Sequence, residues 1–304
     1  MPELLEMTTL LLESPGSLIT GDGQLEYNNY LLGDNVTTFM ESIAGWEDLP
    51  PVDSSNTLRP ASHGAWVGKK LVGQRMITWT GRISTENRSE YQNAMKLLRD
   101  TFIPAVGTEE LSIVIRTRDE TLMAFGTVTQ RQIPMDYAYS YYGAKVTIQF
   151  ECSDPRKYSL GEETVFISMP SLASDGLDYP LVYPLDYGAA VLPNSLIIDN
   201  SGNAPTPVIM NFVGPVTNPT LINQTTSERL SFGIVLAAED TLTVNTRLGT
   251  VLLNGVADRI YTRTLTSSPI LGFDLQSGTN EMQIIAEDWE DGAGVEVIYR
   301  EASF

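Results

Sequence analysis

Short runs in which apolar and polar residues alternate follow one another along most of the chain. Residues 75–83, 110–119, 121–133 and 144–154 are rich in Val, Ile, Thr and Phe, and this alternation is typical of β-strands. The acidic pair at 119–120 suits a hairpin turn between the second and third runs. The first half of the chain is therefore predicted to contain a sheet of at least four strands.

One segment, residues 87–104, has helical spacing instead. Its apolar side chains recur every three or four positions and form one stripe, which consists of Tyr91, Ala94, Met95, Leu98 and Phe102. Asn87 suits the N-cap position, Glu90 three residues later completes a capping-box arrangement, and Pro104 ends the helix. A strand, a helix and three further strands predict an α+β domain with a mostly antiparallel sheet and one packed helix.

Residues 21–73 show neither pattern clearly and are rich in Gly, Asn, Asp and Pro, with Trp46 and Trp66 among them. A loop of this length inside a compact domain is unusual and is often functional. We interpret it as an extended arm that becomes ordered against a partner. The alternative is a long surface loop with two or three weak strands of its own.

From Ser195 to the end the pattern is strand after strand, separated by turn residues at the spacing of a β-sandwich. The predicted strands are residues 195–200, 207–214, 219–223, 229–236, 240–246, 250–255, 270–275, 280–288 and 295–301. A Pro-rich stretch at 170–194 precedes them. We therefore expect a mainly β protein with a first domain at 1–155, a connector at 156–190 and a β-sandwich at 191–304.

Composition argues against most chemistry. The 304 residues include 19 Lys plus Arg and 38 Asp plus Glu, so the formal net charge is −19, and this opposes binding to nucleic-acid phosphates or anionic lipid. The one cysteine, Cys152, excludes intrachain disulfides and thiolate metal clusters, and the one histidine, His63, leaves little for general-base chemistry or zinc. We expect no enzyme, no cofactor and no metal, with an inert, half-buried Cys152 and a structural or interface role for His63.

The acidic turn at residues 286–294 is the one candidate ligand site. Glu287, Asp288, Glu290 and Asp291 could supply oxygen ligands to calcium, but they lack the D-x-D-x-D-G spacing that would make the assignment specific. A hairpin turn with solvated charges is the alternative. Trp289 in the same turn is a candidate exposed aromatic of the kind found on sugar-binding faces.

The first residues combine a short Leu10–Leu12 run with Glu3, Glu6 and Glu13. A secretory signal needs a basic start and a longer apolar run, and a membrane helix needs about 18 apolar residues. We therefore expect neither a secretory leader nor membrane insertion.

Several short motifs in a fixed order resemble the siphophage distal tail protein (Dit) family. In the second half an N-x-G-x-A-x-x-P run, the end of the second strand, a G-x-N turn and a final Tyr-Arg pair carry the resemblance, at Asn200, Gly202, Ala204, Pro207, Gly214, Gly278, Asn280, Tyr299 and Arg300. In the first half the resemblance lies at Gly64, Arg75, Gly81, Phe102 and Pro104.

The resemblance implies a tail-tube-like split barrel followed by a galectin-like β-sandwich. It also implies a structural hub: a hexameric ring in the virion tail tip that joins the tail tube to the tail hub or tail-associated protein and to baseplate or receptor-binding proteins. The protein would be synthesised in the host cytoplasm. Genomic DNA would pass through the ring without specific binding, and we expect a net acidic lumen because residues 1–155 carry 12 Lys plus Arg against 20 Asp plus Glu.

Two other functions stay open at this point. A carbohydrate-binding adhesion module would need clustered exposed aromatics on one sandwich face, and a tail-associated hydrolase would need converging carboxylates. A galectin-like fold does not by itself confer sugar binding.

Overall fold

The computed structural model describes residues 14–104, 107, 110–135, 137, 141–170 and 195–304. The chain divides after Leu160 into two compact units, called here the N-terminal unit (up to Leu160, with Phe304) and the C-terminal unit (Gly161–Ser303). The division lies within the connector predicted at 156–190. Each unit is described by itself below.

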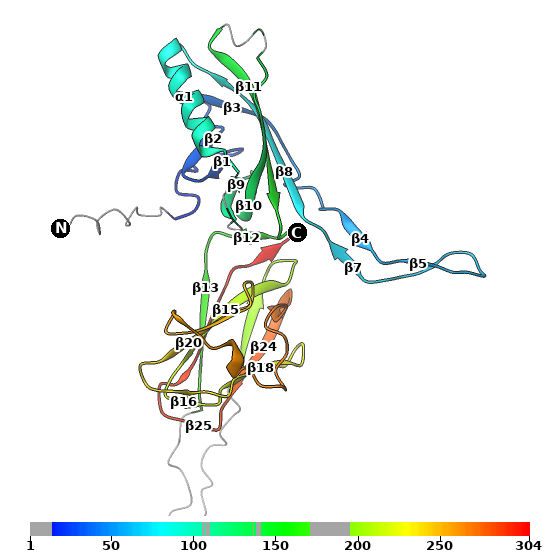
Figure 1. Cartoon of the computed structure of the whole chain (residues 1–304), viewed down its shortest axis with the longest axis vertical. Coiled ribbons are helices and arrows are strands. Elements are labelled where there is room, and N and C mark those ends of the chain that lie inside the picture. The colour runs from blue at the N-terminus through cyan, green and yellow to red at the C-terminus, as the bar shows by residue number, and fades with distance from the viewer. Residues whose placement is uncertain (1–13, 105–106, 108–109, 136, 138–140, 171–194) are drawn as a thin grey trace, which may run out of the picture. The chain divides into compact units, whose positions relative to one another are not determined.

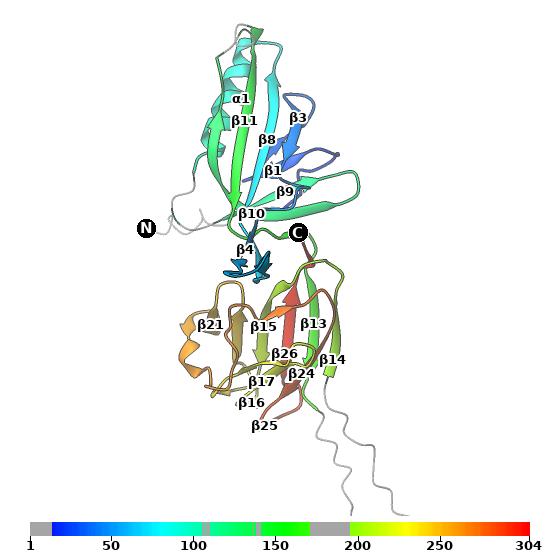
Figure 2. The same ribbon diagram turned by 90° about the vertical axis from the view of Figure 1, so that its right-hand side faces the viewer.

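The N-terminal unit is built on one antiparallel sheet with the order β2-β1-β9-β10-β11-β8-β3 (Figures 1 and 2). Its strands are β1 (Leu25–Tyr27), β2 (Tyr30–Leu32), β3 (Thr38–Ala44), β8 (Arg75–Ser84), β9 (Leu111–Arg116), β10 (Thr121–Gln132) and β11 (Gly143–Cys152), and β12 (Lys157–Ser159) pairs with β10. The long strand β10 pairs with β9 over its first half and with β11 over its second half. The four strands that the alternating pattern predicts are confirmed.

Helix α1 (Arg88–Thr101) covers one face of this sheet. The Asn87 side chain accepts a hydrogen bond from the Glu90 amide (2.9 Å), as the N-cap prediction requires. The helix ends at Thr101, slightly before Pro104, with Phe102 as the C-cap. The helix buries Tyr91, Ala94, Met95 and Leu98 in a core that includes Trp79, Phe102 and Phe150.

The interpretation of residues 21–73 as one extended arm is wrong for its first half. Residues 25–44 form β1, β2 and β3 of the main sheet. Asn28, Asn29, Gly33 and Asn35 have positive φ, so these residues form tight turns between short strands rather than a long loop. Only the second half leaves the sheet, as two short strand pairs: β4 (Val52–Ser54) with β7 (Lys70–Val72), and β5 (Thr57–Leu58) with β6 (Ala65–Trp66).

The C-terminal unit contains two main sheets, ordered β13-β26-β15-β20-β21-β22 and β14-β24-β17-β18. The first comprises β13 (Glu163–Ser168), β26 (Gly294–Tyr299), β15 (Thr206–Val213), β20 (Thr241–Asn245), β21 (Thr250–Leu253) and β22 (Ala257–Asp258), and β23 (Asp274–Leu275) pairs with β15. The second comprises β14 (Ser195–Asn200), β24 (Gly278–Ile285), β17 (Thr220–Asn223) and β18 (Glu228–Ser231). Shorter elements complete the unit: β16 (Val216–Thr217), β19 (Val235–Leu236), β25 (Asp288–Trp289), β27 (Ala302–Ser303) and the 3₁₀-helix η2 (Ile260–Thr262).

A single apolar core lies between these sheets, with Phe212 and Phe232 in edge-to-face contact at 5.6 Å between ring centroids. The mainly β fold with one packed α-helix in its described part and a C-terminal sandwich is confirmed. The strand β13 falls inside the predicted connector, so residues 163–168 belong to the sandwich instead. Residues 171–194, the Pro-rich part of that connector, lie outside the described residues. None of the helices in the described ranges is long and apolar enough to span a membrane.

Candidate assembly interface

Residues 49–73 of the N-terminal unit, called here the ribbon, form a strongly exposed apolar segment. It extends from the end of β3 away from the main sheet, and it returns to β8 (Figure 1). Its large apolar side chains lie in solvent: Leu49, Val52, Leu58, Trp66, Val67 and Leu71. Trp66 is 55% exposed and Val67 is 82% exposed. Exposed apolar side chains gathered on one element indicate an interaction surface.

Among the described residues, the contacts that define the ribbon are local. The Arg59 guanidinium lies 5.9 Å from the centre of the Trp66 ring, and the Arg59 amide donates to the Gly64 carbonyl (3.1 Å) at the tip. A Cβ on Gly68 would lie 2.0 Å from the Ser55 carbonyl oxygen, so the two strand pairs can approach at this point only with glycine. An isolated two-stranded hairpin is marginally stable in water, so the ribbon needs a further surface to pack on.

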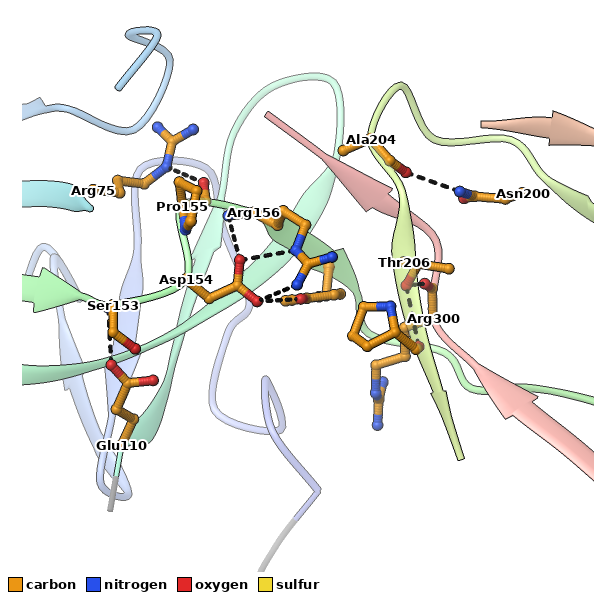
Figure 3. A network of polar contacts seen from close by, with 12 residues as sticks. Arg75, Glu110, Ser153, Asp154, Pro155, Arg156, Asn200, Ala204, Thr206 and Arg300 are labelled. Atoms are coloured by element: carbon orange, nitrogen blue, oxygen red, sulfur yellow. Dashed lines mark hydrogen bonds and ion pairs between the residues drawn. The ribbon is translucent and has the colours of Figure 1, made fainter. Parts of the chain in front are cut away.

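The root of the ribbon is held by a buried charge. Arg75 is 1% exposed, and its Nη1 donates to the carbonyls of Gly45 (2.6 Å), Trp46 (2.8 Å) and Asp48 (2.9 Å). Its Nε donates to the Pro155 carbonyl (2.8 Å; Figure 3). Burial lowers the pKa of this guanidinium from its ordinary value. Arg75 therefore fixes the loop from which the ribbon leaves the sheet.

A second polar cluster follows β11 (Figure 3). The Arg156 guanidinium donates to both carboxylate oxygens of Asp154 (2.9 and 3.0 Å), and the Tyr158 hydroxyl donates to the same carboxylate (2.6 Å). Burial alone would raise the pKa of Asp154, but the hydrogen bonds and charge of Arg156 lower it below the ordinary value. The cluster fixes the chain between β11 and β12.

The face of the main sheet opposite the core is polar. On β8 and β11 the cross-strand pairs are Thr80 with Thr147 and Thr78 with Gln149. Arg82 and Lys145 are also paired across these strands, and Glu41 of β3 binds both, at 2.7 and 3.6 Å. Glu41 therefore offsets one of the two positive charges at this end of the face.

In the C-terminal unit the motif residues have structural roles. Asn200 is buried and donates to the Ala204 carbonyl (2.9 Å; Figure 3), while a Cβ on Gly202 would lie 1.9 Å from the Ala302 carbonyl oxygen. Asn280 is also buried and donates to the carbonyls of Gln276 (2.8 Å) and Gly278 (2.9 Å). These residues close turns, and they form no ligand-binding cluster.

The candidate chemical residues are placed apart. His63 is exposed in the tip of the ribbon, and Cys152 is fully buried at the end of β11, where burial raises the pKa of its thiol to about 12. Burial therefore disfavours the reactive thiolate form, and Cys152 is more deeply buried than the half-buried thiol that we expected. A Cβ on Gly126 would lie 2.7 Å from its Sγ, so the pocket around the thiol is tight.

The acidic turn 286–294 is used within the fold. The Asn218 amide donates to the Glu287 carboxylate (2.8 Å), and the Asp288 carboxylate accepts from the Trp289 amide (3.0 Å). Trp289 is half-buried against the sandwich core, and its Nε1 donates to the Pro170 carbonyl (2.8 Å), so the expectation of an exposed aromatic is wrong. The described residues contain no group of three or more His, Cys, Asp or Glu side chains placed to hold a metal ion.

Comparison with known proteins finds a family similar to the second unit. Residues 201–302 match the family model described as the Siphovirus-type tail component, C-terminal domain. The match lies wholly within the C-terminal unit. The resemblance to siphophage distal tail proteins read from the sequence is therefore confirmed.

Solved structures extend the similarity in fold to nearly the whole chain. The crystal structure of SPP1 Dit, described as a paradigm of the hub adsorption apparatus in phages infecting Gram-positive bacteria, matches with a TM-score of 0.65 at 12% identity, over 93% of this chain and 99% of that chain. The phage P2 baseplate in its activated conformation with Ca matches with a TM-score of 0.53 at 11% identity, over 90% and 97%. The corresponding structure with Sr gives a TM-score of 0.52 at 11% identity, over 91% and 98%. No curated protein sequence matches the chain.

The N-terminal unit contains contacts that the sequence pattern did not reveal. The ion pairs of Glu41 and the buried hydrogen bonds of Arg75 join residues about 30 to 100 positions apart in the chain, and periodicity carries no signal for such pairs. The ribbon left a partial signal: Leu58, Trp66, Val67 and Leu71 stand in a Gly- and Pro-rich segment without the alternation that would bury them.

Proposed function

We propose that the chain is a structural hub of a siphophage tail tip. Six copies form a ring through their N-terminal units, and the ring joins the tail tube to baseplate or receptor-binding proteins held by the C-terminal units. The observation that carries this proposal is the fold similarity to SPP1 Dit across 93% of this chain and 99% of that chain. The proposed place is the virion tail tip, after synthesis in the host cytoplasm.

The ribbon supplies a physical reason for self-association. It holds Arg59, Lys69 and Lys70 against the single acid Asp53, so its net charge is +2 on a chain whose net charge is −19. A basic, apolar hairpin is complementary to the acidic remainder of a second copy. The exposed strand edges of such a hairpin are also satisfied when another chain covers them.

The polar sheet face is suited to contact with moving DNA. If this face lines the ring, Thr78, Thr80, Thr147 and Gln149 present neutral groups, and Glu41 offsets one of the two nearby positive charges. Tight binding to a duplex requires unmatched Lys and Arg side chains. The purified protein is expected not to retard duplex DNA at about 0.15 M salt. A lumen lined by unpaired Lys and Arg in a structure of the ring would contradict the proposed free passage.

The same similarity in fold supports a structural rather than catalytic role. The inert Cys152 and the isolated, exposed His63 provide no nucleophile and base pair. The adhesion-module alternative loses its one aromatic candidate, because Trp289 is half-buried against the sandwich core and its Nε1 is bound to the Pro170 carbonyl. We therefore propose no second function.

The direct test is the mass of the full-length protein in solution and its position on the virion. Six chains of 33.4 kDa give a particle of about 200 kDa, which mass photometry resolves from a monomer. Antibody against the chain should label the tail tip in electron micrographs. A protein that is monomeric at micromolar concentration, and that forms no ring on purified virions, would overturn the proposal.

A matched pair of variants links the ring to the ribbon. Trp66→Ala with Leu71→Ser removes two exposed apolar anchors, and we expect assembly to weaken by about tenfold or more. Leu97→Ser is the control, because Leu97 is 58% exposed on α1 of the same unit, close to the 54% of Leu71. Equal assembly of both variants would show that the ribbon is not part of the interface. The mass measurement would then still test the ring itself.

A further inference from the structure

The two open sides of the C-terminal sandwich differ in charge. One side consists of the sheet edges β18 and β22 together with residues 259–268, and is called here the Arg side. The other consists of the sheet edges β13 and β14, which adjoin each other, and is called here the acidic side. The strand order places these sides at opposite ends of both sheets.

Residues 259–268 close the Arg side by joining the two sheets. The Arg259 amide donates to the Val251 carbonyl of β21 (2.8 Å), and the Thr264 amide donates to the Ser231 carbonyl of β18 (3.0 Å). The Ser268 amide donates to the Arg229 carbonyl (2.7 Å) further along β18. The surface is therefore preformed by backbone hydrogen bonds.

Basic and apolar groups gather on the Arg side. Arg229, Arg259 and Arg263 lie there, which is three of the five Arg among residues 195–304, a segment without Lys. In the described part of the chain none of the three is paired with a carboxylate within 4 Å. Arg263 instead donates to the Ser268 carbonyl (3.2 Å), and Arg259 lies 6.0 Å from the centre of the Tyr261 ring.

The apolar groups on this side are large and exposed. Tyr261 is 75% exposed, Leu265 is fully exposed and Ile260 is 46% exposed. The two acids of the side are used locally, because Asp258 accepts from the Ile260 amide (2.9 Å) and Glu228 accepts from the Thr226 hydroxyl (3.1 Å). The guanidinium groups are therefore available to an acidic partner.

The acidic side has the complementary composition. Glu163 on β13 and Asp199 on β14 are exposed, and Phe166, Leu196 and Ile197 are exposed beside them. Arg300 is occupied by Glu162 (2.9 Å). On the described strands of this side, Glu163 and Asp199 are the exposed charges, so the side can receive a basic partner surface.

We infer that the Arg side of one C-terminal unit docks on the acidic side of the C-terminal unit in a second copy of the chain. Contact between two different surfaces of identical chains is head-to-tail, and it closes into a ring when the rotation between copies permits. Charge complementarity selects this pairing over Arg side against Arg side, where like charges would meet. The contact is separate from that of the ribbon, and each can be present without the other.

Single-cysteine chains test the pairing in the full-length protein. The natural Cys152 is buried with a raised pKa, so it does not compete for oxidation. Leu265→Cys and Ile197→Cys are placed in separate chains, which are mixed, assembled and oxidised. We expect a two-chain disulfide product at least about tenfold more abundant in the mixture than in either chain alone, because contact raises the effective concentration of the thiols.

The control mixes Ile197→Cys with Val36→Cys, since Val36 is 77% exposed in the N-terminal unit. Equal product in the control, or a dominant product from Leu265→Cys alone, would overturn the inference. The absence of cross-linked product in chains that still assemble as a ring of six would also overturn the inference, but it would leave the proposed ring intact. The same absence of product is expected if the Arg side binds an acidic protein other than this chain.

Charge exchange provides a second test. Arg259→Glu with Arg263→Glu, or Glu163→Arg with Asp199→Arg, is expected to weaken the cross-linked contact by about tenfold. A mixture of the two charge-reversed chains should restore it. Weakening without restoration would mean that these four residues do not face one another and would contradict the inference.

Discussion

The ribbon of the N-terminal unit and the Arg side of the C-terminal unit both place large apolar side chains beside basic ones, but they are supported differently. The Arg side is joined by backbone hydrogen bonds to two sheets that share a core. The ribbon consists of two short strand pairs whose described side chains are almost all exposed or half-buried. The Arg side is therefore held in place by its own unit, whereas the ribbon has little within its own unit to pack on.

Removing the ribbon is expected to have the largest effect. The Gly73 amide donates to the Pro51 carbonyl (2.7 Å), so a short Gly-Ser turn can replace residues 52–72 without moving the sheet. We expect the remaining N-terminal unit to fold and assembly to weaken by about a hundredfold or more, because anchors such as Trp66 dominate interface energies. Sedimentation velocity measures the assembly and circular dichroism the fold. Assembly at the wild-type level would show that a surface other than the ribbon holds the copies together.

Replacement of Arg75 tests the root of the ribbon and leaves the residues at its tip unchanged. Arg75→Met leaves the carbonyls of Gly45, Trp46 and Pro155 without their buried donor, and we expect the N-terminal unit to lose about 3 kcal/mol of stability. Arg75→Lys should recover only part of this, because an ammonium cannot reproduce the fork of a guanidinium. Calorimetry should show a lower transition for the N-terminal unit only. A shift of both transitions would mean that the units do not unfold separately.

A buried side-chain amide gives the corresponding stability test in the C-terminal unit. Asn280 makes hydrogen bonds to Gln276 and Gly278 and accepts from Asn223 (3.4 Å). Asn280→Ala is expected to destabilise the C-terminal unit by about 2 kcal/mol. The exposed Gln224→Ala, measured by the same urea titration, should stay within about 0.5 kcal/mol of wild type. Equal losses in the two variants would contradict the structural role assigned to the G-x-N turn.

The pH dependence of Asp154 should be the smallest effect. Because the folded-state pKa of Asp154 is lowered, its contribution to stability is fully present above the ordinary pKa and is lost as pH falls through the lowered value. Asp154→Asn is therefore expected to reduce the unfolding free energy by about 1 to 2 kcal/mol at pH 7 and progressively less below about pH 4. A difference that is constant from pH 7 to pH 2 would show that the Arg156 pair is not its source.

Strands with one buried and one exposed face could be predicted from the sequence, and strands without this alternation could not. In β8 the buried positions alternate with half-buried or exposed ones from Arg75 to Ser84, so the pattern itself identifies the strand. In β4 and β5 every residue is exposed, and no alternation marks them. The strand β13 was hidden for a related reason, because only Ile167 in it is buried.

Candidate surfaces were harder to predict than strands. The burial of Trp289 depends on the Pro170 carbonyl 119 residues earlier, which no local pattern reports. The separation of charge into two sides of the sandwich depends on strand order, because β13 and β14 lie at one end and β18 and β22 at the other. The resemblance to distal tail proteins, by contrast, rested on Asn200, Gly202 and Asn280, whose turns the fold requires.

If the ribbon becomes ordered by packing on a second copy of the chain, hydrogen exchange at residues 49–73 must depend on assembly. The full-length protein is compared at micromolar concentration, where it should assemble, and at a dilution at which mass photometry shows monomers. We predict slowed exchange of the ribbon amides in the assembly and near-free exchange in the monomer, with the amides of β8 and β11 unchanged. Equal exchange of the ribbon in both states would contradict the claim.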